Sequence, residues 1–345
     1  MRKKLISFGM ATLLGVSMLV GCGGNDTAKE GNGGDKKELV EVRVAYMPNM
    51  GSASSLAAAL EQGYFEEQGL KVTVSKFSGG PQEIAALNSG DIDIAQIGHG
   101  AHKLCIQGKA DVFQLDVTSL ADAVIGNKEK GVNTIADLKG KTVATTAGTS
   151  ADVILELALK EAGLTRNDVN IQEMDADGVV PAMISGQIDA CATWSPATLT
   201  IAEKMGDKTV VLANNARYLS EATFPSSYIA TKDFVTNKKD IVVKFATAIQ
   251  KAQDYRLGHL DEVAKAVAKL AETDESVMLN AKNEGNWETA GTEFIKKALE
   301  DGELKSFYEN QQALFIRAGA VEKEVPVEDY VHFDIMKEAN ELATK

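Results

Sequence analysis

A short motif that occurs twice constrains the fold of this chain more than any other feature. Residues 87–94 (LNSGDIDI) recur 96 positions later as residues 183–190 (MISGQIDA), and each copy joins an apolar helix to an apolar strand. A helix–turn–strand unit used twice predicts two similar α/β halves, although a repeat can also serve packing alone. The loops after the copies, 98–100 (GHG) and 194–196 (WSP), would then lie on facing walls of a cleft.

The N-terminus indicates export. Three basic residues at positions 2–4 precede an apolar run from Leu5 to Val20, which is typical of a signal peptide and short for a membrane span. Residues 19–22 (LVGC) resemble the lipobox of bacterial lipoproteins, which implies that residues 1–21 are removed and that Cys22 is acylated. A free or disulfide-bonded thiol is the alternative for Cys22. The segment 22–37 is rich in glycine and charge and lacks large apolar side chains, so we expect a flexible tether.

Charge and cysteine content exclude several classes of protein. The formal net charge is −13, and it becomes three units more negative once the basic leader is removed. Such a chain, without clusters of Lys and Arg interleaved with aromatics, is not expected to bind nucleic acid. The other two cysteines, Cys105 and Cys191, are too few for a disulfide scaffold, so we expect small buried apolar side chains.

Strand-like and helix-like segments alternate from residue 40 to about residue 222. This alternation predicts mostly parallel sheets covered by helices on both faces. The strands are expected at 42–46, 72–75, 92–95, 113–117, 142–145, 169–172, 189–193 and 210–212, with a new series beginning after 123–126, and the helices at 55–62, 82–87, 101–108, 134–138, 151–162, 179–185 and 197–205.

After residue 230 the alternation stops, and long amphipathic helices follow without a further strand-like run. We therefore predict two α/β lobes: residues 38–122 with 228–345 form the first, and residues 123–227 form the second. The chain would cross between them near 120–127 and 222–230, which would act as hinges. Ligand sites in such folds lie outside the carboxyl ends of the strands. The helices are expected at 238–257, 261–272, 274–284, 292–299, 302–318 and 328–343.

Two loops that lead from a strand into a helix could bind a small ligand. In residues 145–152, Thr149 and Asp152 have capping-box spacing, and the free N–H groups of a helix start can hold an anion. In residues 47–54, Asn49, Ser52 and Ser54 offer neutral hydrogen bonds. Ordinary capping explains either loop equally well.

The loops after the two repeat copies carry the other candidates. His99 stands between two glycines and could donate a hydrogen bond to a ligand, whereas a metal site with His102 lacks a third ligand, so we expect none. Trp194 could form an apolar wall, and Trp287 is expected in the core or between the lobes. The chain has no phosphate-binding loop, nucleophile elbow, Cys-x-x-Cys or His-Glu-x-x-His, so catalysis is not expected.

These motifs together resemble the nitrate/sulfonate/taurine-type (NMT1/THI5-like) substrate-binding lipoproteins of ABC importers. The resemblance implies a two-lobed periplasmic-binding-protein fold with two hinge crossings. It also implies a monomer without cofactor or metal, anchored by lipid on the extracytoplasmic face of the cell membrane, that delivers a small molecule to a permease and its ATPase. The resemblance extends over about 40–320 and rests on 45–49, 63–70, 89–93, 135–141 with 148–150, and 185–190 with 194–196.

Position by position, the resemblance also implies a ligand site. The glycine loop departs from the family pattern because His99 and His102 flank Gly100, so a carboxylate or sulfonate could pair with a histidine. The ligand is expected to be a small anion of the aliphatic sulfonate, taurine or nitrate kind, with an aromatic carboxylate or a pyrimidine as the alternative. An enzyme, or a receptor that signals without transport, is the alternative to a binding protein of an importer. The implied ligand-binding residues are Asn49, Met50, Gly51, Ser52, Gly98, His99, Gly148, Thr149, Ser150 and Trp194.

Overall fold

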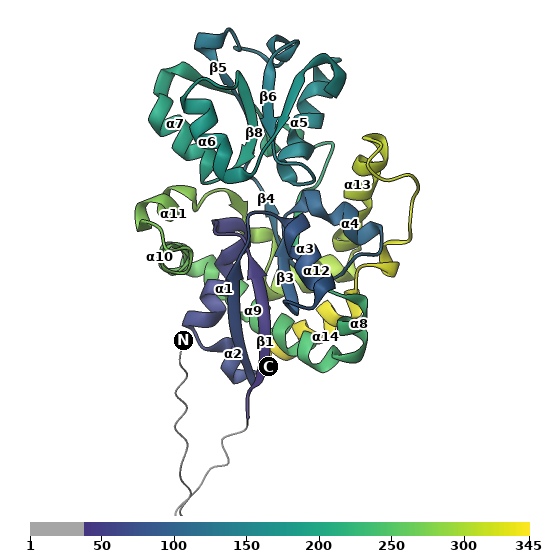
Figure 1. Cartoon of the computed structure of the whole chain (residues 1–345). Helices are drawn as coiled ribbons and strands as arrows, with labels where there is room; N and C mark the ends of the chain where they lie inside the picture. The colour runs from purple at the N-terminus through teal and green to yellow at the C-terminus, as the bar shows by residue number, and fades with distance from the viewer. Residues whose placement is uncertain (1–37) are drawn as a thin grey trace, which may run out of the picture. The chain divides into compact units, whose positions relative to one another are not determined.

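The computed structural model describes residues 38–345. The expected signal peptide (1–21), the expected lipidation site Cys22 and the tether (22–37) lie outside the described residues. Residues 38–345 form one compact unit that contains two β-sheets and their covering helices (Figure 1). This arrangement confirms the α/β class. Among these residues, no helix is both long and apolar enough to cross a membrane.

The first sheet has six strands in the order β11-β4-β10-β3-β1-β2. Strand β1 runs parallel to β2 and β3, whereas β10 runs antiparallel to β3 and β4, and β11 antiparallel to β4. The strands are β1 (Val40–Tyr46), β2 (Leu70–Lys76), β3 (Ile94–Ile97), β4 (Asp111–Ser119), β10 (Pro225–Ala230) and β11 (Gly285–Asn286).

The second sheet has five strands in the order β7-β6-β8-β5-β9. Strand β6 runs parallel to β7 and β8, and β5 runs antiparallel to β8 and β9. The strands are β5 (Asp122–Asn127), β6 (Thr142–Thr145), β7 (Asn170–Glu173), β8 (Ala190–Trp194) and β9 (Thr209–Asn214).

The prediction of mostly parallel sheets is confirmed for strand direction, although both sheets are mixed: β10 and β11 run against the other four strands of the first sheet, and β5 runs against the other four strands of the second. Helical crossovers favour parallel neighbours, but β5 and β10 enter their sheets from the other sheet. Only two residues separate β4 in the first sheet from β5 in the second, so no helix sets the direction of β5. The expectation that no strand follows residue 230 is wrong, since the short β11 pairs with the end of β4.

The two copies of the repeat occupy equivalent places. Each copy turns at a left-handed glycine, Gly90 with φ 79° and Gly186 with φ 71°. Strand β3 lies between parallel β1 and antiparallel β10, and β8 lies between parallel β6 and antiparallel β5. The predicted repeat is therefore a structural repeat, with one copy in each sheet.

Helices cover both sheets, and those of the C-terminal segment pack on the first sheet (Figure 1). Two expected helices are 3₁₀ turns in whole or in part, at His99–Ala101 and Ile135–Leu138. The α-helices are α1 (Met50–Glu61), α2 (Tyr64–Glu67), α3 (Gly80–Ser89), α4 (His102–Ile106), α5 (Ser150–Glu161), α6 (Ala176–Ile184), α7 (Ala197–Met205), α8 (Lys232–Asn237), α9 (Lys239–Gly258), α10 (Leu260–Ala271), α11 (Glu275–Ala281), α12 (Thr292–Glu300), α13 (Glu303–Arg317) and α14 (Phe333–Ala343).

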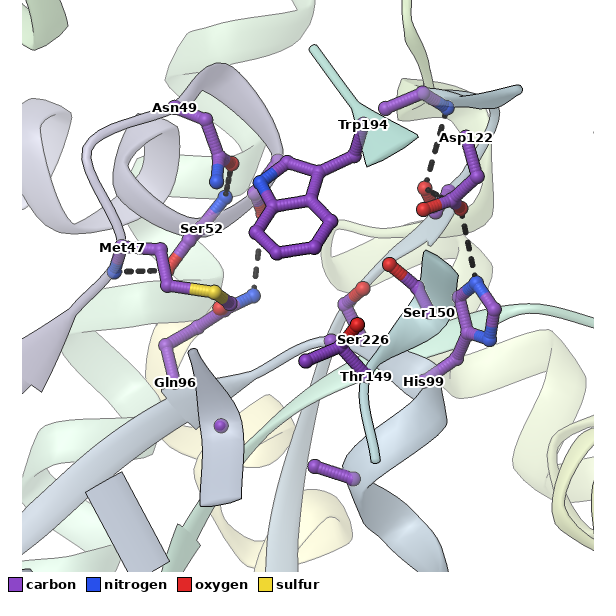
Figure 2. Close-up of a pocket in the computed structure, with 16 residues that line it drawn as sticks. Met47, Asn49, Ser52, Gln96, His99, Asp122, Thr149, Ser150, Trp194 and Ser226 are labelled. Atoms are coloured by element: carbon purple, nitrogen blue, oxygen red, sulfur yellow. Dashed lines mark hydrogen bonds and ion pairs between the residues drawn. The ribbon is translucent and has the colours of Figure 1, made fainter. Parts of the chain in front are cut away.

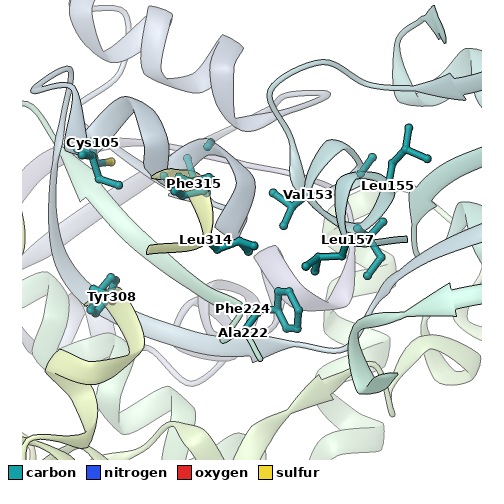
Figure 3. Close-up of a cluster of buried hydrophobic side chains, with 14 of the residues drawn as sticks. Cys105, Val153, Leu155, Leu157, Ala222, Phe224, Tyr308, Leu314 and Phe315 are labelled. Atoms are coloured by element: carbon teal, nitrogen blue, oxygen red, sulfur yellow. The ribbon is translucent and has the colours of Figure 1, made fainter. Parts of the chain in front are cut away.

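One buried apolar cluster includes side chains from the helices of both sheets. Figure 3 shows Leu157 of α5, which covers the second sheet, in the same cluster as Phe224 and Phe315. Cys105 and Cys191 are both buried free thiols, as expected, and burial raises the pKa of each, that of Cys191 to about 12. The apolar contact between the halves holds the loops described next close to one another.

Candidate functional site

Loops at the ends of strands from both sheets enclose a small cavity of about 40 Å³ (Figure 2). Eight of the ten residues predicted for the site line this cavity. Its walls also include the segments where the chain crosses between the sheets, at Ser119, Asp122 and Ser226. The eight predicted residues are Asn49, Gly51, Ser52, Gly98, His99, Thr149, Ser150 and Trp194.

Two predicted residues, Met50 and Gly148, do not line the cavity. Met50 is the first residue of α1, and its side chain is buried in the apolar core. Gly148 takes a left-handed turn with φ 76° beside Pro81 and Lys103, where it serves the entry into α5. A loop position alone therefore does not show which way a side chain points.

The N-terminus of α1 forms one wall of the cavity. Asn49 caps the helix, since its Oδ1 accepts a hydrogen bond from Ser52 N at 2.9 Å. The Ser52 hydroxyl in turn accepts from Met47 N at 2.9 Å. This cap explains why the helix begins at Met50, five residues before the predicted start at 55, and why the first turn faces the cavity.

The N-terminus of α5 forms the opposite wall. Thr149 is the N-cap, as predicted, and its Oγ1 accepts from Ala151 N at 3.3 Å. Asp152 does not close the predicted capping box, because its Oδ2 accepts from Gly148 N at 2.6 Å instead. The positive ends of two helices, α1 and α5, thus meet at one cavity.

Gly100 allows the two walls to touch. A Cβ atom at this position would lie 2.1 Å from the carbonyl carbon of Thr149 and 2.4 Å from Ser150 N. Backbone atoms cannot move aside as a flexible side chain could, so only glycine fits here. The glycine loop after the first repeat copy is therefore shaped by the start of α5 in the other half.

His99 is buried against Asp122, with 2.9 Å between Nε2 and Oδ2. Burial raises the pKa of Asp122, but the charge and hydrogen bond of His99, with Ser150 and Asn215 nearby, outweigh burial and hold that pKa below its usual value. The carboxylate is consequently ionised at neutral pH. His102 points into the core instead, where burial first and the charge of His99 second lower its pKa to about 3.

Gln96 is a lining residue that sequence reasoning missed, as it missed Asp122. Its Nε2 donates to Gly51 O at 3.1 Å and to Asp116 Oδ2 at 3.0 Å. Asp116 is itself buried and paired with buried Arg256 at 3.3 Å. The available signal for both residues was a polar side chain at the end of an otherwise apolar strand or at a chain crossing.

Trp194 separates the cavity from a wider vestibule of about 480 Å³. Met47, Asn49 and Trp194 line both spaces, and Figure 2 shows the indole reaching across toward Asn49. Phe77 lines only the vestibule. Trp287 packs in the core, as expected, with Arg256 stacked 4.6 Å from its ring centroid.

Glu284 lies beside the loop after the second repeat copy. Its backbone oxygen accepts from Leu120 N at 2.8 Å in the link between the sheets. Burial raises the pKa of its side chain to about 7; Ser195 opposes this shift, and the charge of Asp122 adds to it. Glu284 thus carries a carboxyl that titrates near neutral pH at a chain crossing.

No Lys or Arg from residues 38–345 lines the cavity. Within the same residues, no group of three or more His, Cys, Asp or Glu side chains is placed to hold a metal ion. The polar groups available to a ligand are helix N-termini, hydroxyls, amides and the His99–Asp122 pair. This arrangement suits binding by hydrogen bonds.

Comparison with known proteins identifies the family of this chain. The model of the family described as NMT1/THI5 like matches residues 52–263. The chain belongs to this family. A Brucella abortus relative named as a binding protein is 32% identical over 84% of this NMT1/THI5-like chain and 90% of its own length. A Bacillus subtilis relative named as an aliphatic sulfonates-binding protein is 28% identical over 96% of this chain and 97% of its own length.

A solved structure shares the fold of this chain. The alkanesulfonate-binding protein of Xanthomonas axonopodis pv. citri, bound to MOPS, superposes with a TM-score of 0.65 at 22% identity, over 86% of this NMT1/THI5-like chain and 99% of that protein. This likeness confirms the predicted periplasmic-binding-protein fold. The two chain crossings, β4 to β5 and β9 to β10, are those expected for that fold.

Proposed function

We propose that this protein is the extracytoplasmic solute-binding component of an ABC importer and captures a small organic anion. The observation that carries the proposal is the cavity lined by loops from both sheets. A ligand that contacts both walls stabilises the closed form more than the open one. The lobes would be 38–122 with 228–345, and 123–227, moving about the two crossings.

The anion would be held without a cation. The N-termini of α1 and α5 both face the cavity, and each presents backbone N–H groups and a positive dipole end. The imidazole ring of His99 also lines this cavity. The name of the Bacillus subtilis relative supports a sulfonate. Trp194 and the aromatic vestibule favour the alternative of an aromatic carboxylate or a pyrimidine.

The expected setting follows from the leader and the family. A lipid anchor at Cys22 would keep the monomer at the outer face of the cell membrane, beside a permease and its ATPase. Binding relatives support a binding role for this chain in place of catalysis.

A thermal-shift screen tests the proposal. The purified protein is heated at pH 6 and pH 8 with alkanesulfonates, taurine, nitrate, aromatic carboxylates and pyrimidines. A ligand at 100 times its dissociation constant adds about 2.7 kcal/mol to the free energy of unfolding, which raises Tm clearly. Absence of any shift, with no small molecule released from the denatured protein by mass spectrometry, would contradict the proposal.

A further inference from the structure

A fully buried ion pair is bonded to one wall of the cavity. Asp116 of β4 and Arg256 of α9 are both 0% exposed, with 3.3 Å between Oδ1 and Nη1. Arg256 Nη2 also donates to the backbone oxygen of Asp116 at 3.0 Å. The cost of taking two charges out of water can exceed the gain from their attraction, so a buried pair is weak evidence for a role in stability. The residues that the pair holds are more informative about its role.

One of these residues belongs to the cavity wall. Asp116 Oδ2 accepts a hydrogen bond from Gln96 Nε2 at 3.0 Å, and the same nitrogen donates to Gly51 O at 3.1 Å. Both Gln96 and Gly51 line the cavity. Figure 2 shows the Gln96 amide on the same side of the cavity as Asn49 and Ser52. The Asp116 carboxylate thus holds the Gln96 amide and, through it, the first turn of α1.

Two further contacts of the pair go to the next residues of α1. Arg256 Nη1 donates to Ser54 Oγ at 2.7 Å, and Ser55 Oγ donates to Asp116 Oδ1 at 2.7 Å. Both serines are fully buried, so neither hydroxyl is available to a ligand. Ser54, which the sequence offers as a hydrogen-bonding residue of the loop 47–54, instead connects α1 to the ion pair.

The pair connects the C-terminal helical segment to the site. Arg256 lies on α9, 140 residues along the chain from Asp116. Trp287 covers the guanidinium at 4.6 Å, but its only donor, Nε1, bonds to Lys282 O at 2.7 Å. The hydrogen bonds of the ion pair, and not the ring packed on it, therefore reach the cavity wall.

Anion binding by a helix N-terminus depends on where that terminus is held. The N–H groups of the first turn must point at the ligand, because the attraction of the dipole falls off within one turn. Groups that bind a ligand have to be held within about 0.5 Å of their productive positions by the residues behind them. The Asn49 cap fixes where α1 begins along the chain, and the ion pair fixes the first turns of α1 against β3 and β4.

We propose that Asp116 and Arg256 are positioning residues for solute binding, which hold Gln96 and the N-terminal turn of α1 where they line the cavity. The inference rests on the proposed function, because it concerns the affinity for the solute. Neither residue of the pair lines the cavity itself. Removing the pair should therefore weaken binding through the wall that it holds, even where the protein stays as stable as before.

Replacing the pair as a unit tests this role on the purified full-length protein. Asp116→Leu combined with Arg256→Met removes both charges together, and such replacements of buried pairs are often neutral or stabilising. Gln96 Nε2 and Ser55 Oγ each keep a second hydrogen bond, at 3.1 Å and 2.8 Å. We expect Tm to stay close to that of the unaltered protein, whereas Kd rises at least about 10-fold.

Thermal melts measure Tm, and calorimetry with ethanesulfonate, 2-aminoethanesulfonate, nitrate and benzoate measures Kd. An unchanged Kd in the double variant overturns the inference and leaves the proposed function intact. No binding of any of the four probes to the unaltered protein contradicts the proposed capture of small anions, and the inference fails with it.

Single serine variants decide the matter if the double variant is unstable. Ser54→Ala removes the bond between Arg256 and α1 and leaves the ion pair in place. Ser227→Ala is the matched control, because Ser227 is an equally buried serine of the first sheet, 2.9 Å from the Tyr308 hydroxyl, that does not line the cavity. We expect similar Tm values but about 3- to 10-fold weaker binding in Ser54→Ala alone. Equal Kd values in the two variants would overturn the inference.

Discussion

After the first copy of the repeat the chain enters a loop of glycines around His99, whereas after the second copy it enters a loop led by Trp194. The copies themselves match: each turns at a left-handed glycine and feeds a central strand with one parallel and one antiparallel neighbour. The loops differ in bulk and in polarity. Helix and strand packing fixes the geometry of the repeat, while the loops beyond it can vary to build a site.

The two loops complement each other across the cavity. On the first wall, Gly100 has no side chain, so the backbone of Thr149 can approach closely. On the second wall, the wide indole of Trp194 divides the cavity from the vestibule. One wall therefore allows close backbone approach and carries buried polar groups, whereas the other provides an apolar surface against which a ligand can pack.

We expect the largest loss of ligand affinity from a substitution at Gly100. In Gly100→Ala the new methyl group would collide with the Thr149 backbone, so the halves could not close and affinity should fall at least about 100-fold. Calorimetry with a ligand found in the screen measures the loss. Gly258→Ala is the control, because a Cβ there would meet nothing within 4 Å and Gly258 does not line the cavity, so affinity should change little. Equal losses in both variants would contradict the role of Gly100 in closure.

Replacing Trp194 should cause the next largest loss of ligand affinity. Trp194→Ala removes the surface shared by cavity and vestibule, and we expect about 10- to 100-fold weaker binding with Tm nearly unchanged. Trp287→Ala should do the reverse, since it empties a core site beside Arg256 and costs about 3–5 kcal/mol of stability. Calorimetry and thermal melts on both variants separate the two roles. Unchanged affinity in Trp194→Ala would remove this residue from the site.

Glu284, which lies beside the loop after the second repeat copy, should make the stability of the protein depend on pH. The pKa of Glu284 rises from 4.5 to about 7 through burial, so the folded state holds the proton more tightly than the unfolded state. The penalty for ionising Glu284 is absent below pH 4.5, grows toward pH 7 and then levels off at no more than about 3 kcal/mol. Glu284→Gln should therefore raise Tm at pH 8 and not at pH 4.5.

Melting curves from pH 4.5 to pH 8 provide the measurement for Glu284→Gln. Glu288→Gln is the matched control, because Glu288 is exposed four residues further along the chain. A pH-independent difference between Glu284→Gln and the unaltered protein would show that Glu284 does not titrate at the crossing.

The smallest expected effects are on stability, and they test whether the two copies of the repeat are structurally equivalent. Gly90→Ala and Gly186→Ala both force a side chain into the left-handed region, and each should cost about 1 kcal/mol by urea unfolding. Gly258→Ala is the control, since Gly258 ends α9 with room for a methyl group and should be neutral or stabilising. Clearly unequal costs at positions 90 and 186 would show that the copies are not structurally equivalent.

The features that could be predicted from the sequence are those that depend on neighbours along the chain. The repeat, the helix–strand alternation, the Thr149 cap and the family motifs were all visible as local patterns, and the structure and comparisons bear them out. Eight of the residues that line the cavity were also predicted, from loops at strand ends. Local hydrogen bonding and side-chain periodicity are encoded within a few residues, which is why they could be predicted.

The remaining features depend on contacts between segments that lie far apart in the sequence. The antiparallel strands β5 and β10 depend on how the chain passes between sheets, and the burial of Met50 depends on which way the first turn of α1 faces the core. Asp122 and Gln96 became site residues because segments far apart in the sequence meet at one cavity. Such meetings are set by long-range packing, which no local pattern records.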